Sequence, residues 1–216
     1  MIPRLFTLLL LLAVIGGCGP QMRMLPVGDN NLSVQTSIGG PMISVRGPAI
    51  PVPYAMVGAT YGLTDHLNVH SDLHVTSAVF KFLGLTPGIS WFPARSEARW
   101  QPSLSFTALA FSDFKDTRIY PELITTLANR QSHEVIPFFG VVHTFQTDSK
   151  PEYLPSAFVG MAFPYKQSRF VIEFQALALN FQRDKEAPYY MTLTDRRGAV
   201  GVQFGYSLAF GGNHHD

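Results

Sequence analysis

The last stretch of the chain, Arg197 to Phe210, limits the possible folds more than any other. Large apolar side chains occupy every second position, and glycine or small and polar residues fill the positions between them. The large residues are Val200, Val202, Phe204, Tyr206, Leu208 and Phe210. Side chains alternate between the two faces of a β-strand, whereas a helix repeats every 3.6 residues. The stretch therefore predicts a strand with one wholly apolar face.

The composition favours a membrane protein that crosses the bilayer with strands. Of 216 residues, 46% are hydrophobic and only 14% are charged, against the roughly 25% charged residues of soluble domains. Beyond residue 17 no apolar run approaches the roughly 20 residues of a spanning helix. An apolar, aromatic chain without spanning helices has the composition that a transmembrane barrel requires. The net charge of +1 gives no indication of a nucleic-acid surface.

Residues 1–17 have the features of a signal peptide, with Arg4 before an apolar core. The sequence Ile15-Gly16-Gly17-Cys18 resembles the lipobox of bacterial lipoproteins. The resemblance implies cleavage before Cys18 and acylation of that cysteine, with palmitate as an expected acyl group. Residues 18–30 are then a lipidated tether. An ordinary signal peptide followed by a chance cysteine is the alternative. Because Cys18 is the chain's one cysteine, internal disulfides are excluded.

Alternating segments separated by turn residues predict ten strands in the body of the chain. These segments are 31–38, 54–62, 67–77, 85–93, 102–111, 119–130, 135–146, 154–163, 169–181 and 197–210. Residues 39–53 are expected to be a loop, and residues 211–216 a short tail. An even strand number lets both ends of the barrel wall lie on one side of the membrane. Eight strands is the alternative if the segment 119–130 is not a strand or if two short segments fuse.

Three motifs resemble those of bacterial outer-membrane β-barrel proteins: the terminal strand ending on Phe210, the turn Tyr61-Gly62-Leu63-Thr64-Asp65, and the lipobox. The resemblance implies an all-β, antiparallel up-and-down barrel over residues 31–210, lipid-anchored in the outer membrane of a Gram-negative-type bacterium. Its partners would be membrane lipid and, through external loops, lipopolysaccharide or another envelope protein. A soluble, lipocalin-like barrel uses the same alternation with its apolar faces turned inward.

His70, Asp72 and His74 are the candidate ligand or metal residues. The period of two in Leu67, Val69, Leu73 and Val75 indicates a strand, so these three side chains would point together into the lumen. Imidazole and carboxylate groups suit a divalent transition metal. Alternate strand residues lie almost 7 Å apart, however, so neighbouring strands would have to contribute ligands. A polar lumen face without a metal is the simpler interpretation, and no cofactor is expected.

No catalytic residues are expected. Ser132, His133 and Glu134 are adjacent in sequence, but a nucleophilic triad requires groups that converge in space. The tail residues His214, His215 and Asp216 are expected to be solvated. The first functional hypothesis is a structural or interaction barrel that works through its external loops. The alternatives are a narrow transporter or ligand-binding barrel, a periplasmic lipocalin-like lipoprotein, and last an outer-membrane hydrolase.

Overall fold

The structure is a computed structural model that describes residues 22–44, 49–93, 99–131, 134–147, 150–182, 191–192 and 197–211. Its elements are one short helix, α2 (Val75–Val79), and eleven strands among these residues. The strands are β1 (Leu32–Ser44), β2 (Ala49–Pro51), β3 (Tyr54–Thr64), β4 (Leu67–His74), β5 (Leu83–Trp91), β6 (Trp100–Ser112), β7 (Thr117–Asn129), β8 (Ile136–Phe145), β9 (Tyr153–Tyr165), β10 (Ser168–Gln182) and β11 (Arg197–Phe210). No helix in the described ranges is long and apolar enough to cross a membrane.

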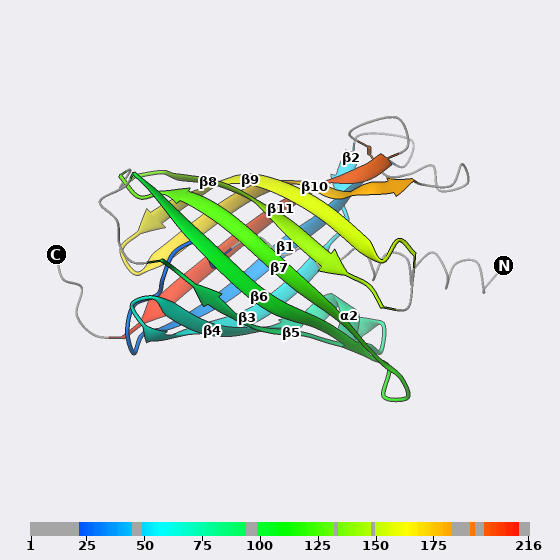
Figure 1. Ribbon diagram of the computed structural model, residues 1–216, viewed down its shortest axis with the longest axis horizontal. Helices are drawn as coiled ribbons and strands as arrows, with labels where there is room; N and C mark the ends of the chain where they lie inside the picture. The colour runs from blue at the N-terminus through cyan, green and yellow to red at the C-terminus, as the bar shows by residue number, and fades with distance from the viewer. Residues whose placement is uncertain are drawn as a thin grey trace.

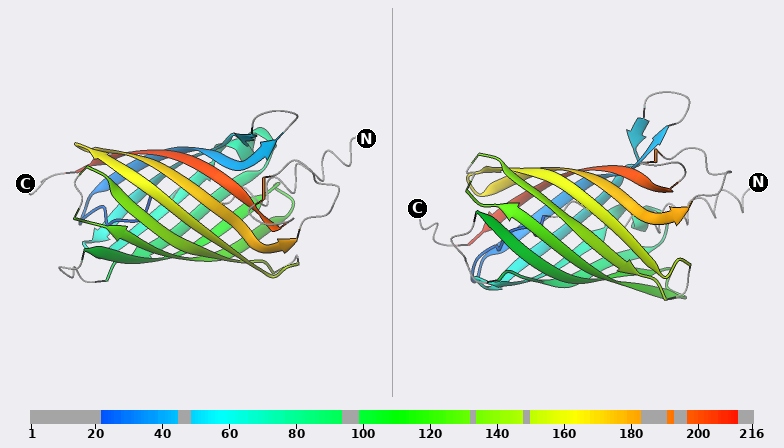
Figure 2. Two further views of the ribbon diagram at one scale, coloured as in Figure 1. Left: turned by 90° about the horizontal axis from the view of Figure 1, so that it is seen from above. Right: turned by 45° about the horizontal axis from the view of Figure 1, so that its top comes forward.

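Ten of the strands form a closed antiparallel barrel (Figures 1 and 2). Each strand pairs with its neighbour in the chain, apart from β2, which is an extra strand beside β1. The barrel closes where β1 pairs with β11, from Leu32 opposite Phe210 to Pro41 opposite Gly201. The predicted ten-stranded barrel is therefore confirmed, and the eight-stranded alternative is wrong because residues 117–129 form a full strand.

The two faces of the wall have opposite chemistry. Large apolar side chains face outward, among them Phe106, Val159 and Phe174, each more than half exposed. Polar side chains such as Thr107, Glu173 and Gln203 are buried inside. This arrangement suits a wall that meets lipid outside and encloses a polar lumen. The lipocalin-like alternative is wrong, because it required the apolar faces to point inward.

Two predicted boundaries differ from the structure. Residues 39–44, expected in a loop because of Gly39, Gly40 and Pro41, continue β1 and pair with β11 and β2. Proline fits there because the pairing of β1 with β3 has already ended at Gly39, so its missing N–H breaks no bond to that strand. The predicted strand 67–77 ends at His74, where α2 begins.

The two ends of the barrel differ in their connections. Two residues link β3 to β4 and β9 to β10 at one end, which we call the short-connection end. The link that contains α2 and the β6–β7 turn lie at the other, long-connection end (Figure 1).

A charge placed on the outer wall tests whether this wall meets lipid. Val159 lies at the middle of β9 and is 57% exposed, whereas Tyr165 lies at the end of that strand and is 69% exposed. We expect Val159→Arg to lower the free energy of unfolding in lipid vesicles by about 2–4 kcal/mol, and Tyr165→Arg by about 0–1 kcal/mol. Urea titration measures both changes. Equal effects for the two variants would contradict a membrane-spanning wall.

Candidate functional site in the barrel lumen

The structure places His70, Asp72 and His74 on β4 with all three side chains in the lumen, as the alternation predicts. They are 6%, 5% and 0% exposed. Their environments differ, however, because each side chain faces different neighbours across the sheet. The question for the site is therefore which groups each of them binds.

His74 is held by both ring nitrogens. Nδ1 hydrogen-bonds with the Tyr54 hydroxyl, which also lies 3.1 Å from Ser77 Oγ. Nε2 lies 2.6 Å from Thr86 Oγ1. Both nitrogens are thus engaged in hydrogen bonds, which leaves no lone pair directed at a metal. His74 therefore stabilises the lumen wall on β3, β4 and β5.

Asp72 and His70 have separate partners. Asp72 accepts a hydrogen bond from Gln35 Nε2 at 2.6 Å and forms an ion pair with Arg23. His70 Nδ1 lies 3.4 Å from Ser90 Oγ, and its Nε2 has no partner among the described residues. Within those ranges, no three His, Cys, Asp or Glu side chains lie close enough to hold a metal ion. The three residues form a polar wall, and the structure gives the metal hypothesis no support.

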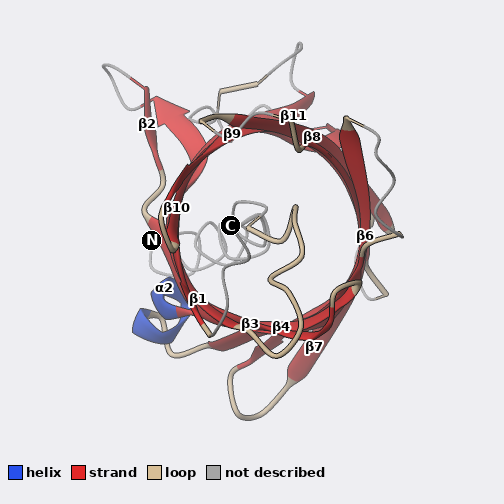
Figure 3. Ribbon diagram, turned by 90° about the vertical axis from the view of Figure 1, so that its left-hand side faces the viewer, coloured by secondary structure: helices blue, strands red, loops and turns tan. Residues whose placement is uncertain are grey.

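The partner of Asp72 comes from an unexpected part of the chain. Residues 22–30, which we call the lumen segment, lie inside the ring of strands (Figure 3). Met24 is fully buried and Met22 nearly so. The described part of the predicted tether is therefore packed within the barrel and does not trail outside it. Cys18, Ser132, His133, His214, His215 and Asp216 lie outside the described residues, so acylation of Cys18 stays a prediction.

A tight turn joins the lumen segment to β1 at the short-connection end. The N–H of Asn31 donates to the Gly28 carbonyl at 3.3 Å, and Gly28 has a φ of +95°. The Asn30 N–H donates to the Gly62 carbonyl at 3.0 Å, and the Gly62 N–H donates to the Asn31 carbonyl at 2.9 Å. A side chain at position 62 would collide with the Gly28 carbonyl. Because Gly62, the glycine of the predicted Tyr-Gly-Leu-Thr-Asp turn, has no side chain, the backbone of the lumen segment can pack against it.

The segment fits two unlike walls. Met22 and Met24 belong to a buried apolar cluster on β7 to β10, here called the apolar wall. Its members are Ile124, Ala128, Ile136, Phe138, Val142, Phe158, Ala162 and Val171. Arg23, between the two methionines, turns instead to Asp72 on the opposite side of the ring. Met22 and Met24 therefore face one wall and Arg23 the other, although the backbone of residues 22–25 is formed of turns and bends.

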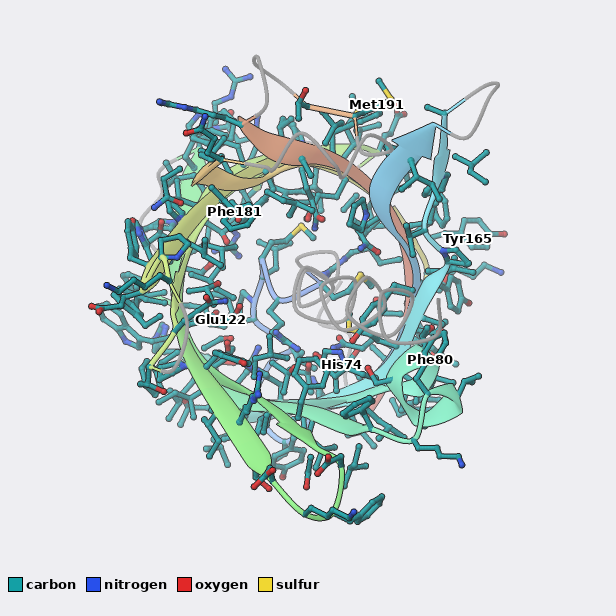
Figure 4. The ribbon with its side chains drawn as sticks, turned by 90° about the vertical axis from the view of Figure 1, so that its right-hand side faces the viewer. His74, Phe80, Glu122, Tyr165, Phe181 and Met191 are labelled. Atoms are coloured by element: carbon teal, nitrogen blue, oxygen red, sulfur yellow. The ribbon has the colours of Figure 1, made fainter. Side chains whose placement is uncertain are left out.

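A second carboxylate completes the surroundings of Arg23. Glu122 on β7 lies inside the ring (Figure 4) and is 4% exposed. It accepts hydrogen bonds from Thr107 at 3.1 Å and Thr144 at 2.9 Å, and it attracts the Arg23 charge. Sequence reasoning missed both Arg23 and Glu122. Glu122 left a faint signal as a lone charge within an apolar strand, but Arg23 lies in a stretch without periodicity.

A small cavity lies beside the segment. The cavity next to Met22, bordered by Gln35, Ser37, Met56 and Asp72, holds about 10 Å³, room for about one water molecule. An eight-stranded barrel is just wide enough for side chains to fill. Ten strands enclose more space than that, and the lumen segment occupies the excess.

Comparisons with known proteins give distant structural matches alone. No protein-family model matches the chain, and no curated protein matches its sequence. A structure of the NanC porin is similar with 9% identity and a TM-score of 0.47, over 82% of this chain and 98% of that one. The outer membrane protein OprG from Pseudomonas aeruginosa is similar with 9% identity and a TM-score of 0.35, over 87% of this chain and 100% of that one. The CymD monoaromatic hydrocarbon channel is similar with 8% identity and a TM-score of 0.38, over 88% of this chain and 90% of that one.

Such distant similarity carries no argument about function. The predicted resemblance to outer-membrane β-barrels is confirmed at the level of architecture, and the rest depends on the lumen of this chain.

The ion pair predicts how firmly the segment is held. Removing one partner of a buried pair costs about 3–5 kcal/mol, so Arg23→Gln should release the segment. We expect Met24 to be oxidised by peroxide at least tenfold faster than in the wild type, since oxidation follows exposure. Peptide mass spectrometry measures this rate, with the exposed Met191 as internal reference. Lys115→Gln, in the β6–β7 turn, is the matched control. An unchanged rate of Met24 oxidation in Arg23→Gln would show that the Arg23–Asp72 ion pair does not hold the segment.

The turn at Gly62 offers a second, uncharged test. Gly62→Ala puts a Cβ against the Gly28 carbonyl, whereas Gly201→Ala meets only Gln175 and Leu177 side-chain atoms, at 3.1–3.3 Å. We expect Gly62→Ala to speed Met24 oxidation and Gly201→Ala to leave it unchanged. The same rate in both variants would show that the turn does not hold the segment.

Proposed function

We propose that the chain is a lipid-anchored outer-membrane β-barrel that acts as a narrow transporter and rests in a closed state. The observation that carries the proposal is the lumen segment: a stretch of chain that is not part of the barrel wall lies inside the ring of strands and contacts its inner face (Figure 4). The sequence favoured a structural or interaction barrel. The removable filling supports the transporter alternative instead.

The energetics suit a gate. The strands are joined by continuous backbone ladders, whereas side-chain contacts and the few hydrogen bonds of the turn hold the segment. Elements with few backbone hydrogen bonds open at lower free energy than core strands. Separating the partners of a buried ion pair costs about 3–5 kcal/mol. Such a cost for the Arg23–Asp72 pair would keep the open state at roughly 1% or less, since about 1.4 kcal/mol corresponds to a factor of ten. A stimulus that weakens the Arg23–Asp72 pair would then open the lumen.

The charges left in the lumen predict the selectivity of the open state. Asp72, Glu122 and Glu173 are buried acidic residues of the wall, and Arg169 is a half-buried basic one. Without Arg23, carboxylates exceed guanidinium groups among these residues. Rings of acidic side chains favour cations. The transported species is therefore expected to be a small cationic or neutral solute.

Planar-bilayer recording tests the proposal. We expect the wild type to be closed with rare openings, and a deletion of residues 22–27 to conduct steadily with cation preference. Arg23→Glu, which sets a negative charge beside Asp72 and Glu122, should raise the open fraction at least tenfold. Each variant is first checked for a heat-dependent shift in SDS-gel mobility, which shows a folded barrel. A folded deletion variant that does not conduct would refute the transporter.

An interaction barrel is the second candidate, favoured by the long-connection end. Phe114, at the tip of the β6–β7 turn, is 81% exposed. A groove of about 590 Å³ lies between the β8–β9 connection and β10, bordered by Lys150, Tyr153 and Phe181. Aromatic and cationic groups at this end suit contact with lipopolysaccharide or another envelope protein. This candidate gains if the folded deletion variant stays silent in the bilayer.

A further inference from the structure

The lumen segment is informative about chemistry as well as closure, because it shows what the lumen binds. Three consecutive residues, Met22, Arg23 and Met24, meet two kinds of surface. The guanidinium lies with Asp72 and within the field of Glu122, and the two thioether side chains pack on the apolar wall. We propose that the lumen is a binding site for cationic amphiphiles, and that the segment occupies it as a built-in ligand.

The charged part of the site is preorganised by the wall. Gln35 holds one oxygen of Asp72, while Thr107 and Thr144 each donate to Glu122. Gly58 lies so close to Asp72 that any side chain there would displace the carboxylate. Both carboxylates are therefore fixed before a cation arrives, which reduces the free-energy cost of binding. A guanidinium or ammonium group is the chemistry that two such carboxylates recognise.

The apolar part of the site is large and contiguous. Phe138 and Phe158 have ring centroids 6.2 Å apart with their planes tilted by 52°, and they belong to the same buried cluster as Val142 and Ile124. In an otherwise polar lumen, this surface is covered by Met22, Met24 and the partly buried Leu25. An unbranched apolar arm on the ligand would cover the same area. Flexible methionine side chains, which adapt to irregular surfaces, indicate that fit here depends on apolar contact more than on one shape.

Buried polar atoms on β4 and β6 add hydrogen-bonding groups to the lumen wall. His70 Nε2, both side-chain polar atoms of Asn68 and Ser103 Oγ are buried, with no hydrogen-bond partner in the part of the chain that the structure describes. They lie on β4 and β6, where His70 is two residues and Asn68 four residues along β4 from Asp72. Buried polar groups normally have a partner. A ligand with hydroxyl or amide groups near its cation can supply one, which distinguishes this site from a purely electrostatic one.

The proposal rests on the transporter function proposed above, since it names the class of solute. The test uses the folded deletion variant lacking residues 22–27 and a fluorescent acetyl-Met-Arg-Met-Leu-amide peptide, with fluorescence anisotropy as the readout. We expect saturable binding to the deletion variant and at least tenfold weaker binding to the wild type, whose own segment fills the site. Asp72→Asn in the deletion background should weaken binding at least tenfold.

Matched probes separate the two halves of the site. Replacing arginine by glutamine in the peptide removes the charge, and replacing both methionines by serine removes the apolar arms. Each change is expected to weaken binding at least tenfold. Equal binding of all three peptides, or no binding to a folded deletion variant, would overturn the proposal.

The failures of this site and of the gate are distinguishable. A deletion variant that conducts but does not bind the peptide would support the transporter proposal and refute the proposed site for cationic amphiphiles. A deletion variant that binds the peptide but does not conduct would support the proposed binding site and refute the transporter proposal. If both hold, the peptide should block the conductance of the deletion variant, and the arginine-to-glutamine peptide should not.

Discussion

Ring closure between the first and last barrel strands is the constraint on which the rest of the structure depends. In lipid, each backbone N–H and C=O needs a partner within the protein, and an open sheet edge would leave a row of them unpaired. The ten residue pairs from Leu32–Phe210 to Pro41–Gly201 remove that edge. Closure also fixes which face of every strand points inward. The position of Asp72, Glu122 and the apolar wall is therefore a consequence of the same register.

Closing ten strands creates a second problem, since the enclosed space exceeds what the wall's own side chains fill. The chain solves it with residues 22–30. The polar wall around Asp72 and the apolar wall around Phe138 and Phe158 lie on opposite sides of the ring, and the Met-Arg-Met sequence matches both. Either wall alone would be poorly satisfied: buried carboxylates without a cation are costly, and exposed phenylalanine rings in a wet lumen lose the benefit of burial.

The same match explains why the segment can serve as a gate. Its contacts are specific but few, and its backbone–backbone hydrogen bonds within the described residues are those of the turn beside Gly62. A closed lumen of this kind differs from an open porin, in which the wall itself sets the bore. In the gate that we propose, the state of the Arg23–Asp72 ion pair sets whether the lumen is filled. The charge and apolar surface that hold the segment are also the chemistry offered to a solute, so closure and ligand choice are properties of one site.

The sequence by itself determined the barrel. Period-two alternation and turn residues identified all ten strands and turned His70, Asp72 and His74 to the lumen, because each of these features is local to a strand. The end of the strand at His74 and the continuation of β1 through Gly39–Pro41 depended on which neighbour was present, so local pattern missed them. The lumen segment left no periodic signal, since its residues match walls formed by strands 50 to 150 positions away. Only the tertiary structure brought Arg23 to Asp72 and Glu122, because ring closure alone places β4 opposite the apolar strands with residues 22–30 between them.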